Sequence, residues 1–291
     1  MTPESSLRLR RSALYVPGSN ARALAKAATL PADVLILDLE DAVLPEAKVA
    51  ARDGVRALVE AGAFGQREVI VRINGPETPW GPDDLRAAAG CGADGILLPK
   101  VEHATTVTGV ARSLEQLGAA GNLRLWVMAE TPRGVLGMAA ITGASPRLAA
   151  VVVGTADLAK ALRLPGSPGR EGLQTALEQC VLAARASGLD ILDGVFADLA
   201  DNAGFLAECR QGRLLGFDGK TVIHPGQISP ANEAFGVSAD EARAAAELIA
   251  GWEAAGAGVA LVNGRMVERL HVDEARRRLA LHRAGLEAMP P

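Results

Sequence analysis

The 291-residue chain contains only three cysteines and four histidines, and it lacks several patterns that would place it in other classes of protein. Cys91, Cys180 and Cys209 form no C-x-x-C pair, so the sequence predicts neither a disulfide framework nor a zinc site. The reducing cytosol is therefore the expected compartment. No G-x-G-x-x-G or Walker sequence is present either, which disfavours a glycine-rich phosphate loop.

Charge and hydropathy argue against two further classes of partner. The formal net charge is -4 and no basic block occurs, so neither nucleic acid nor a membrane surface is a predicted partner. Every apolar run is broken well short of the roughly 20 residues that a membrane span needs. The run after Arg11 ends at Pro17-Gly18, which is too short for a signal peptide. These features predict a cytoplasmic protein.

The chain does contain a repeated unit, in which a short apolar run rich in β-branched residues is followed by a helix-compatible segment. Such runs are typical of buried parallel strands. They occupy residues 12–16, 34–37, 68–74, 95–100, 125–129, 150–153, 191–195 and 219–225. This repetition predicts an α/β fold, a (β/α)₈ TIM barrel, with a doubly wound open sheet as the alternative architecture.

The predicted barrel domain covers residues 1–235, and residues 236–291 form a C-terminal helical extension that acts as an oligomer contact or a lid. The extension is predicted to contain a helix over 239–255, a flexible joint at 256–258, a short segment over 259–267 and a basic helix over 272–284. Within the barrel, the stretch 163–172 is rich in Pro, Gly and Ser, which predicts a mobile loop over the active face.

Two carboxylates at the ends of neighbouring predicted strands indicate a metal site. Glu130 follows the run 125–129, and Asp157 follows the run 150–153. Adjacent strand ends lie roughly 5 Å apart, so both acids could hold one divalent cation. Because no His or Cys accompanies the pair, the predicted cation is Mg²⁺. The alternatives are a structural salt bridge for Glu130 and a helix N-cap for Asp157.

Further polar residues stand at predicted strand ends, which surround one mouth in a barrel. Arg72 lies in an apolar strand and must find a carboxylate, either on the substrate or on an internal partner. Glu40 and Asp41 either support a metal-bound water or pair with Lys48 and Arg52 on the following helix. The other residues expected at the mouth are Asn74, Lys100, Asp193 and His224.

Lys100, Asn74, His224 and Asp38 have separate interpretations. Lys100 contacts a phosphate or carboxylate of the substrate, or it is a solvated loop lysine. Asn74 is a candidate substrate contact. The favoured interpretation of His224 is a His-Pro turn with the imidazole hydrogen-bonded to the backbone, and Asp38 is expected to be structural.

Seven short motifs, taken together in their order and spacing, resemble the citrate lyase β-subunit-like branch of the HpcH/HpaI aldolase superfamily. The resemblance runs from about Arg11 to Leu279. The motifs are Arg11-Ser12-Ala13-Leu14-Tyr15-Val16-Pro17-Gly18, Leu37-Asp38-Leu39-Glu40-Asp41-Ala42-Val43 with Lys48 and Ala51-Arg52, Val71-Arg72-Ile73-Asn74, Leu98-Pro99-Lys100-Val101-Glu102, Glu130-Thr131, Gly154-Thr155-Ala156-Asp157-Leu158-Ala159 and Ile223-His224-Pro225-Gly226-Gln227-Ile228.

The resemblance implies a Mg²⁺-dependent (β/α)₈ enzyme, usually trimeric, that cleaves or forms a carbon–carbon bond between a 2-oxo acid and an acetyl-type coenzyme A thioester. Glu130 and Asp157 match the family's metal ligands, Arg72 matches a substrate contact, and Glu130 also lies beside substrate. The pair Glu40-Asp41 stands where pyruvate-type aldolases of the superfamily carry a histidine after the acid, which disfavours sugar-acid aldolase chemistry.

One segment of the chain departs from the family pattern, and several other functions are alternatives. Family lyases carry Gly-x-Met-Ile-Asp on a C-terminal lid, whose aspartate is the acid/base group, and this chain has Glu268 at that position. The extra methylene alters reach by about 1 Å, and misplacement on that scale can cost ~100-fold in rate. The rivals are an aldolase on free 2-oxo acids, a thioester hydrolase, and a lyase subunit that works only inside a citrate lyase complex.

Overall fold

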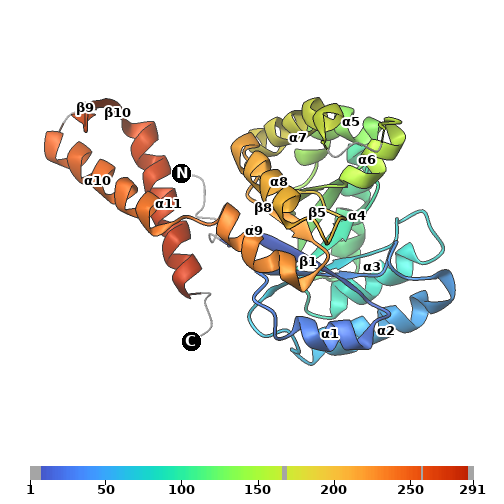
Figure 1. Cartoon of the computed structure of the whole chain (residues 1–291). Helices are drawn as coiled ribbons and strands as arrows, with labels where there is room; N and C mark the ends of the chain where they lie inside the picture. The colour runs from blue at the N-terminus through green and yellow to red at the C-terminus, as the bar shows by residue number, and fades with distance from the viewer. Residues whose placement is uncertain (1–7, 166–168, 257, 288–291) are drawn as a thin grey trace.

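The computed structural model describes residues 8–165, 169–256 and 258–287. Strands β1 to β8 form a closed barrel in sequence order, each pairs in parallel with its neighbours, and helices cover the outside (Figure 1). The predicted (β/α)₈ barrel is confirmed. Within the described residues, no helix is long and apolar enough to cross a membrane.

The elements have the following bounds. The strands are β1 Ser12–Pro17, β2 Val34–Asp38, β3 Glu68–Arg72, β4 Gly95–Leu98, β5 Arg124–Ala129, β6 Leu148–Val153, β7 Asp190–Asp193, β8 Gly219–Val222, β9 Val259–Val262 and β10 Arg265–Glu268. The α-helices are α1 Ala21–Ala27, α2 Lys48–Glu60, α3 Gly81–Gly90, α4 Ala104–Gln116, α5 Pro132–Thr142, α6 Thr155–Ala161, α7 Gln174–Ala186, α8 Asn202–Leu215, α9 Ile228–Phe235, α10 Ala239–Ala255 and α11 Arg269–Glu287. The 3₁₀ helices are η1 Pro45–Ala47, η2 Glu171–Leu173 and η3 Pro225–Gln227.

Alternation along the strands decides which side chains fill the barrel and which pack under the helices. In β2, Val34 and Ile36 belong to the small inner cluster, whereas Leu35 and Leu37 belong to the large outer cluster beneath the helices. Asp38 continues the inward series, because successive side chains of a strand point to opposite faces. The strand therefore delivers a buried carboxylate to the inside of the barrel at its carboxyl end.

The amino ends of the strands are closed by a buried arginine. Arg10 binds Glu68 through two hydrogen bonds of 2.8 and 2.7 Å and Asp190 through one of 2.6 Å. Its guanidinium also lies 5.0 Å from the centroid of the fully buried Trp126 ring. These contacts form a floor under the inner cluster, so the open end of the barrel is the carboxyl end.

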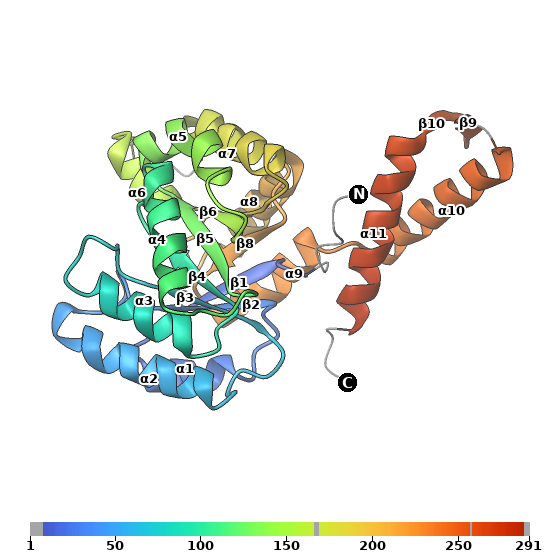
Figure 2. The ribbon, with the colours of Figure 1, turned by 180° about the vertical axis from the view of Figure 1, so that it is seen from behind.

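The C-terminal extension is present and leaves the barrel to one side (Figures 1 and 2). It begins after α9 with a capping box, in which Ser238 and Glu241 satisfy each other's backbone amides at the start of α10. Helices α10 and α11 are joined by the hairpin β9–β10. The hairpin turns at Asn263 and Gly264, whose positive φ angles of 51° and 75° suit a two-residue turn.

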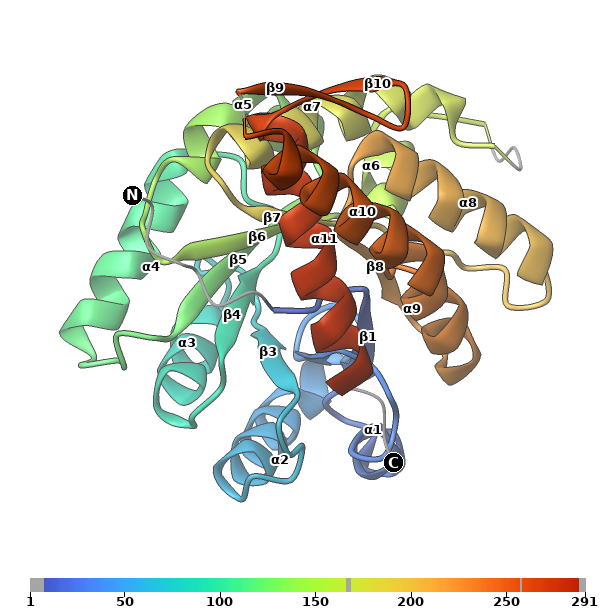
Figure 3. The same ribbon diagram turned by 90° about the vertical axis from the view of Figure 1, so that its left-hand side faces the viewer.

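The extension packs near the floor of its own barrel. In α11, Arg277 donates to Asp218 at 3.2 Å, and Asp218 directly precedes β8 at its amino end. His282 of the same helix lies 2.8 Å from the carbonyl oxygen of Val237. Figure 3 shows α10 and α11 in front of the barrel with β9 and β10 at their far end. The hairpin is therefore remote from the mouth of its own chain.

Several predicted boundaries shift by a few residues. The predicted strand 191–195 ends at Asp193, and the predicted strand 219–225 ends at Val222. The helix predicted over 272–284 begins at Arg269, and the segment 259–267 is an antiparallel hairpin. Of the predicted loop 163–172, residues 166–168 lie outside the described residues. The domain boundary at 235/236, which falls between α9 and α10, and the lid role of the extension stay predictions.

Candidate active site

A cavity of about 400 Å³ opens at the carboxyl ends of the strands. Its polar wall comes from residues that follow different strands and are far apart in the sequence. The lining residues are Tyr15, Pro17, Asp38, Asp41, Ala42, Arg72, Met128, Glu130, Val153, Gly154, Thr155, Ala156, Asp157, Val195, Thr221 and Ile223. The barrel thus brings together Arg72, Asp41, Glu130 and Asp157, as the sequence predicted.

A second hollow of about 480 Å³ lies outside the barrel, between α2 and α3. Its three arginines pair with acids of the same two helices: Arg52 with Asp84 and Asp83, Arg56 with Glu60, and Arg86 with Asp83. No buried charge is left to bind a ligand there. The mouth of the barrel is therefore the better candidate for an active site.

Arg72 is the centre of the polar wall. Its guanidinium binds Asp38 through two hydrogen bonds, from Nε at 2.7 Å and from Nη2 at 2.6 Å. The register between β2 and β3 places these two residues side by side. The guanidinium also lies 4.9 Å from the centroid of the Tyr15 ring and donates from Nη1 to the Met128 sulfur at 3.7 Å.

Burial alone would lower the pKa of Arg72, but hydrogen bonding to Asp38 and the nearby negative charges raise it, so the guanidinium stays charged. Asp38 in turn accepts from the backbone N–H groups of Glu40 at 2.9 Å and Ala42 at 3.1 Å. Asp38, which we expected to be structural, therefore joins Arg72 to the turn after β2. It also lines the cavity.

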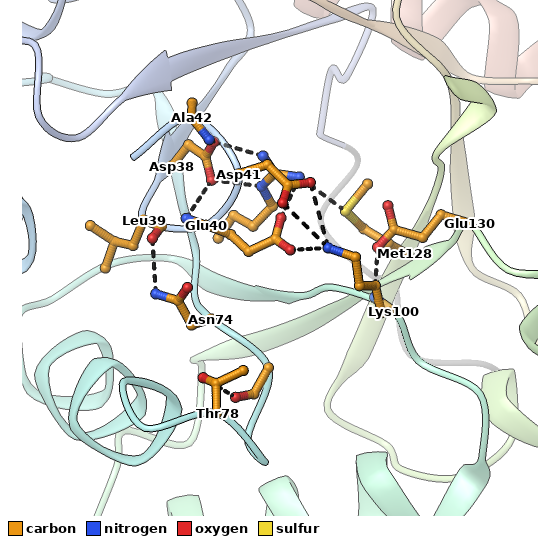
Figure 4. A network of polar contacts seen from close by, with 12 residues as sticks. Asp38, Leu39, Glu40, Asp41, Ala42, Asn74, Thr78, Lys100, Met128 and Glu130 are labelled. Carbon is orange, nitrogen blue, oxygen red and sulfur yellow. Dashed lines mark hydrogen bonds and ion pairs between the residues drawn. The ribbon is translucent and has the colours of Figure 1, made fainter. Parts of the chain in front are cut away.

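Glu40 lies between two cations (Figure 4). Its Oε1 contacts the ammonium of Lys100, and its Oε2 lies 3.0 Å from Nη1 of Arg72. The Oε2 atom is buried and receives no directed hydrogen bond from the described residues, so the contact with Arg72 is one of charge alone. Burial raises the pKa of Glu40, and the charge of Arg72 opposes that rise.

The same ammonium of Lys100 reaches 3.4 Å from Asp41, whose side chain is 57% exposed and lines the cavity. Lys100 itself is 45% exposed, and it adopts a left-handed backbone with φ of 49°. This backbone turns its N–H toward Glu130, to which it donates at 2.6 Å. Lys100 is thus neither a freely solvated loop lysine nor buried, and it stays a candidate contact for an anionic ligand.

Glu130 is 2% exposed and follows β5 in the inward series of Trp126 and Met128. Burial raises its pKa to about 7, and the hydrogen bond from the Lys100 backbone only partly offsets that effect. On its other side lies Gly154, where an added Cβ would sit 2.4 Å from the Glu130 Cβ and 2.7 Å from its Oε2. The carboxylate is therefore held in place but poorly solvated.

Asp157 lies in the first turn of α6, three residues after the N-cap, which is Gly154. The alternative that Asp157 caps this helix is therefore wrong. Its half-buried side chain lines the same cavity as Glu130 and has no hydrogen bond or ion pair with the described residues. Strands β5 and β6 are neighbours, as predicted.

The donors of this pair suit a hard divalent cation. Both are carboxylates, one buried with a raised pKa and one without a protein partner, and a cation between them would neutralise charge that the protein itself leaves uncompensated. No group of three or more His, Cys, Asp or Glu side chains that could hold a metal occurs among the described residues. The remaining ligands would therefore come from water and substrate.

Two other candidates, Asn74 and His224, are hydrogen-bonded within the protein. Asn74 donates to the Leu39 carbonyl at 2.9 Å and to Asp84 at 2.6 Å, so its amide holds the turn after β2, and direct contact with substrate stays a prediction. His224 accepts from the Gly226 N–H at 3.1 Å, as the turn hypothesis expected.

The expectation that Asp193 faces the mouth is wrong. In β7 the inward side chain is Leu192, so Asp193 points outward and is fully buried behind the barrel wall. It binds Arg170 at 2.7 and 2.9 Å and lies 3.3 Å from the ammonium of Lys220, which also contacts Glu208. This group is a structural ion cluster that fixes the chain before α7 to β7, β8 and α8.

The alternative pairing of Glu40 and Asp41 with Lys48 and Arg52 is also wrong. Arg52 pairs with Asp84, and Lys48 donates to backbone carbonyls instead of carboxylates.

Glu268, the candidate acid of the extension, ends β10, and its backbone N–H donates to Nδ1 of His271 at 3.0 Å. Because the extension packs at the floor, this side chain does not reach the cavity of its own chain.

Sequence reasoning missed Tyr15, Thr155 and Thr221, all of which line the cavity. Tyr15 could have been found, because it lies two residues after Ala13 in the first predicted strand and so shares its inward face. Burial raises the pKa of the Tyr15 hydroxyl well above its ordinary value. The two threonines carry no charge and have no distinguishing pattern in the sequence.

Comparisons with known proteins show the family to which the chain is similar. Residues 11–225 match the family HpcH/HpaI aldolase/citrate lyase. A (3S)-malyl-CoA thioesterase of Cereibacter sphaeroides (strain ATCC 17025 / ATH 2.4.3) is 50% identical over 273 residues, which are 93% of each chain. The citrate lyase subunit beta of Escherichia coli (strain K12) is 35% identical over 97% of this chain and 95% of that protein.

The chain is also similar to a solved structure. The protein CitE from Mycobacterium tuberculosis, in complex with magnesium, acetoacetate and coenzyme A, superposes with a TM-score of 0.74 at 29% identity. The alignment covers 93% of this chain and 97% of that chain.

Proposed function

Because the chain belongs to the HpcH/HpaI aldolase/citrate lyase family, we propose that it is a Mg²⁺-dependent enzyme that cleaves the carbon–carbon bond of a malyl-type coenzyme A thioester. The products would be a 2-oxo acid and an acyl thioester, and the reverse reaction is a condensation. The observation that carries the proposal is that Arg72 and Asp38 line the same cavity as Glu130 and Asp157, while the buried Glu40 contacts Arg72.

Glu130 and Asp157 would hold the cation. Bound there, Mg²⁺ supplies Lewis acidity that lowers the pKa of a substrate hydroxyl and favours its ionised form. The CitE protein of Mycobacterium tuberculosis has been solved with magnesium, acetoacetate and coenzyme A, and this supports the same classes of ligand here.

The residues around the cavity have separate proposed roles. Asp41, exposed in the cavity wall, would take the proton of the substrate hydroxyl. As the bond between the hydroxyl carbon and the thioester α-carbon breaks, its electron pair moves to the acyl thioester, and the hydroxyl carbon becomes the carbonyl of the oxo acid. Arg72 would stabilise the negative charge that develops, while Asp38 and Glu40 hold its guanidinium. Lys100 would attract the anionic substrate.

The released acyl thioester must gain a proton, and we propose that Glu268 of a neighbouring copy supplies it. The β9–β10 hairpin, which carries Glu268, lies on the floor side of its own barrel, and this position supports proton donation from one copy to the active site of another. We further propose a homotrimer located in the cytoplasm. A citrate lyase complex with a carrier subunit is the alternative assembly, since citrate lyase subunit beta is among the relatives.

Glu268→Gln is expected to lower kcat about 100-fold and to leave Mg²⁺ affinity unchanged, because the amide cannot donate a proton but lies far from Glu130 and Asp157. Steady-state kinetics and titration calorimetry measure the two quantities. Mixing this variant with a Glu130→Gln variant should restore part of the activity if Glu268 acts on a neighbouring copy. No recovery in mixed oligomers would contradict that arrangement.

Gly154→Ala is expected to weaken Mg²⁺ binding about 10-fold, although the substitution removes no ligand. The new Cβ would meet Glu130 Cβ at 2.4 Å and Oε2 at 2.7 Å, both closer than van der Waals contact allows, so the carboxylate must move. Gly109→Ala in α4 is the matched control, because nothing lies within 4 Å of the added Cβ there. Equal Mg²⁺ affinity in both variants would show that Glu130 is not held against Gly154.

Hydrolysis of the thioester is a second candidate function, and one observation favours it. The malyl-CoA thioesterase of Cereibacter sphaeroides shares more identity with this chain than the Escherichia coli citrate lyase subunit does, 50% against 35%. In hydrolysis, water breaks the carbon–sulfur bond and leaves the carbon skeleton intact. The same cation site and Arg72 would bind the hydroxyl and carboxylate of the substrate.

Product analysis with malyl-CoA tests both functions. Carbon–carbon cleavage gives glyoxylate and acetyl-CoA, whereas hydrolysis gives malate and free coenzyme A, and chromatography separates all four. Turnover of free malate, which has no thioester, would indicate an aldolase that acts on free acids. Turnover only of malyl groups attached to a carrier protein would indicate a subunit of a citrate lyase complex. Absence of turnover with every thioester, in the presence of Mg²⁺, would refute the proposed function.

A further inference from the structure

Lys48, the first residue of α2, is a buried cation without an acidic partner. It is 6% exposed, and its ammonium donates to the carbonyl oxygens of Leu39 and Glu40, each at 3.0 Å. The ammonium also lies 5.1 Å from the centroid of the Trp80 ring. Within the described residues it forms no ion pair with a carboxylate. A buried charge is costly unless its partners compensate for lost water, so these contacts are specific.

The two carbonyls belong to the turn after β2, which carries Glu40 and Asp41. The Leu39 carbonyl also accepts from Asn74 at 2.9 Å, and the Leu39 N–H donates to the Arg72 carbonyl at 2.9 Å. The Glu40 carbonyl accepts from the Val43 N–H at 3.0 Å, and Lys48 is the one side chain among the described residues that reaches it. Lys48 therefore fixes the main chain of Glu40 itself.

The side chain of Glu40 lies between Arg72 and Lys100. A shift of its backbone would move both ion contacts together. The turn region also carries three acids, Asp38, Glu40 and Asp41, and two cations, Arg72 and Lys100, lie against them. An ammonium behind the turn adds a third positive charge without occupying space in the cavity.

We propose that Lys48 is a positioning residue, which holds the 39–43 turn by its carbonyls and thereby sets the Glu40 carboxylate between Arg72 and Lys100. The kinetic consequence rests on the proposed function, but the positioning does not. Lysine suits this place because a side chain in the first turn of a helix points back toward the residues that precede it. A shorter or neutral side chain could not bind both carbonyls.

Hydrogen exchange tests the positioning directly. Lys48→Met keeps the length of the side chain and removes the donors, so amide exchange in a peptide covering residues 39–43 should rise at least about 10-fold. Val107→Ala, at a fully buried site in another helix, α4, is the control for general loss of stability. Lys48→Arg keeps the charge and donors, so it should restore part of the protection.

Turnover tests the consequence. In Lys48→Met, kcat should fall about 10- to 100-fold, because misplacement of about 1 Å at a reacting group can cost that much. The KM for the thioester should change less than threefold, and Lys48→Arg should recover part of kcat. Val107→Ala should lower the melting temperature but keep kcat within twofold.

Each result has a defined meaning. Exchange over 39–43 that rises no more in Lys48→Met than in Val107→Ala would overturn the proposal and leave Lys48 as a packing residue. A second outcome would overturn the link to Glu40. In it, Lys48→Met increases exchange over 39–43 and leaves kcat unchanged, although Arg72→Met, made separately, abolishes turnover. If the wild-type protein turns over no thioester, the proposed function fails, and the exchange experiment still decides whether Lys48 positions the turn.

Discussion

Arg72→Met is expected to lower kcat about 100- to 1000-fold and to reduce the free energy of unfolding by about 3–5 kcal/mol. The loss of activity follows from removing the guanidinium that, among the described residues, lines the cavity. The loss of stability follows because Asp38, which is 1% exposed, and Glu40 would keep their charges without this cation. Breaking a buried ion pair by removing one partner leaves an uncompensated charge.

A double variant separates the two effects. Arg72→Met with Asp38→Asn removes both partners, so much of the lost stability should return while kcat stays low. Chemical denaturation and steady-state kinetics on the single and double variants measure the two quantities. If Arg72→Met keeps wild-type turnover, the guanidinium serves only to neutralise Asp38 and Glu40, and the proposed mechanism loses its main support.

Glu130→Gln and Asp157→Asn are each expected to weaken Mg²⁺ binding by at least about 100-fold, or ~2.7 kcal/mol, and to abolish turnover. The amides keep the size of the side chains but remove the negative charges that a hard cation requires. Titration calorimetry measures the affinity. Glu102→Gln, which removes a half-exposed carboxylate paired with Arg133, is the matched control. Unchanged binding in both variants would exclude this pair as the metal site.

Glu130→Gln should also change the melting temperature, and the sign of the change should depend on whether Mg²⁺ is bound. Burial raises the pKa of Glu130 from its ordinary 4.5 to about 7, so the folded state holds this proton more tightly than the unfolded state. The free energy of unfolding without metal therefore falls as pH rises from about 4.5 to 7. Above that range, the whole stabilisation that the protonated Glu130 provides is lost. At pH 8 with a chelator, Glu130→Gln should melt at a higher temperature than the wild type. Saturating Mg²⁺ should reverse the order.

Much of the fold was predictable because most strands of the barrel are short apolar runs, several of which end at or just before a charged residue. The runs at 34–37 and 68–74 gave both the strands and the positions of Asp38 and Arg72. The sequence could not choose between substrate and internal partner for Arg72. That choice depends on the register of β2 against β3, which places Asp38 beside it.

The failures have similar physical causes. A strand that is buried on both faces gives no signal of which face lies inside the barrel, so Asp193 was placed at the mouth although Leu192 is the inward residue. The alternative that Glu40 or Asp41 pairs with Lys48 considered only that Lys48 lies on the following helix, and α2 begins at Lys48 itself. Its side chain therefore meets the carbonyls of the preceding turn.

The sealed floor formed by Arg10 beneath Trp126 has a consequence for the order of events during turnover. Under the proposed function, reactants and products would share one entrance, and the oxo acid, held by Arg72 and the cation, would form at its deeper end. The acyl thioester would then leave before the oxo acid, and in the condensation direction the oxo acid would bind first. Product-inhibition patterns should accordingly be those of an ordered sequence, with the oxo acid as the last product to dissociate.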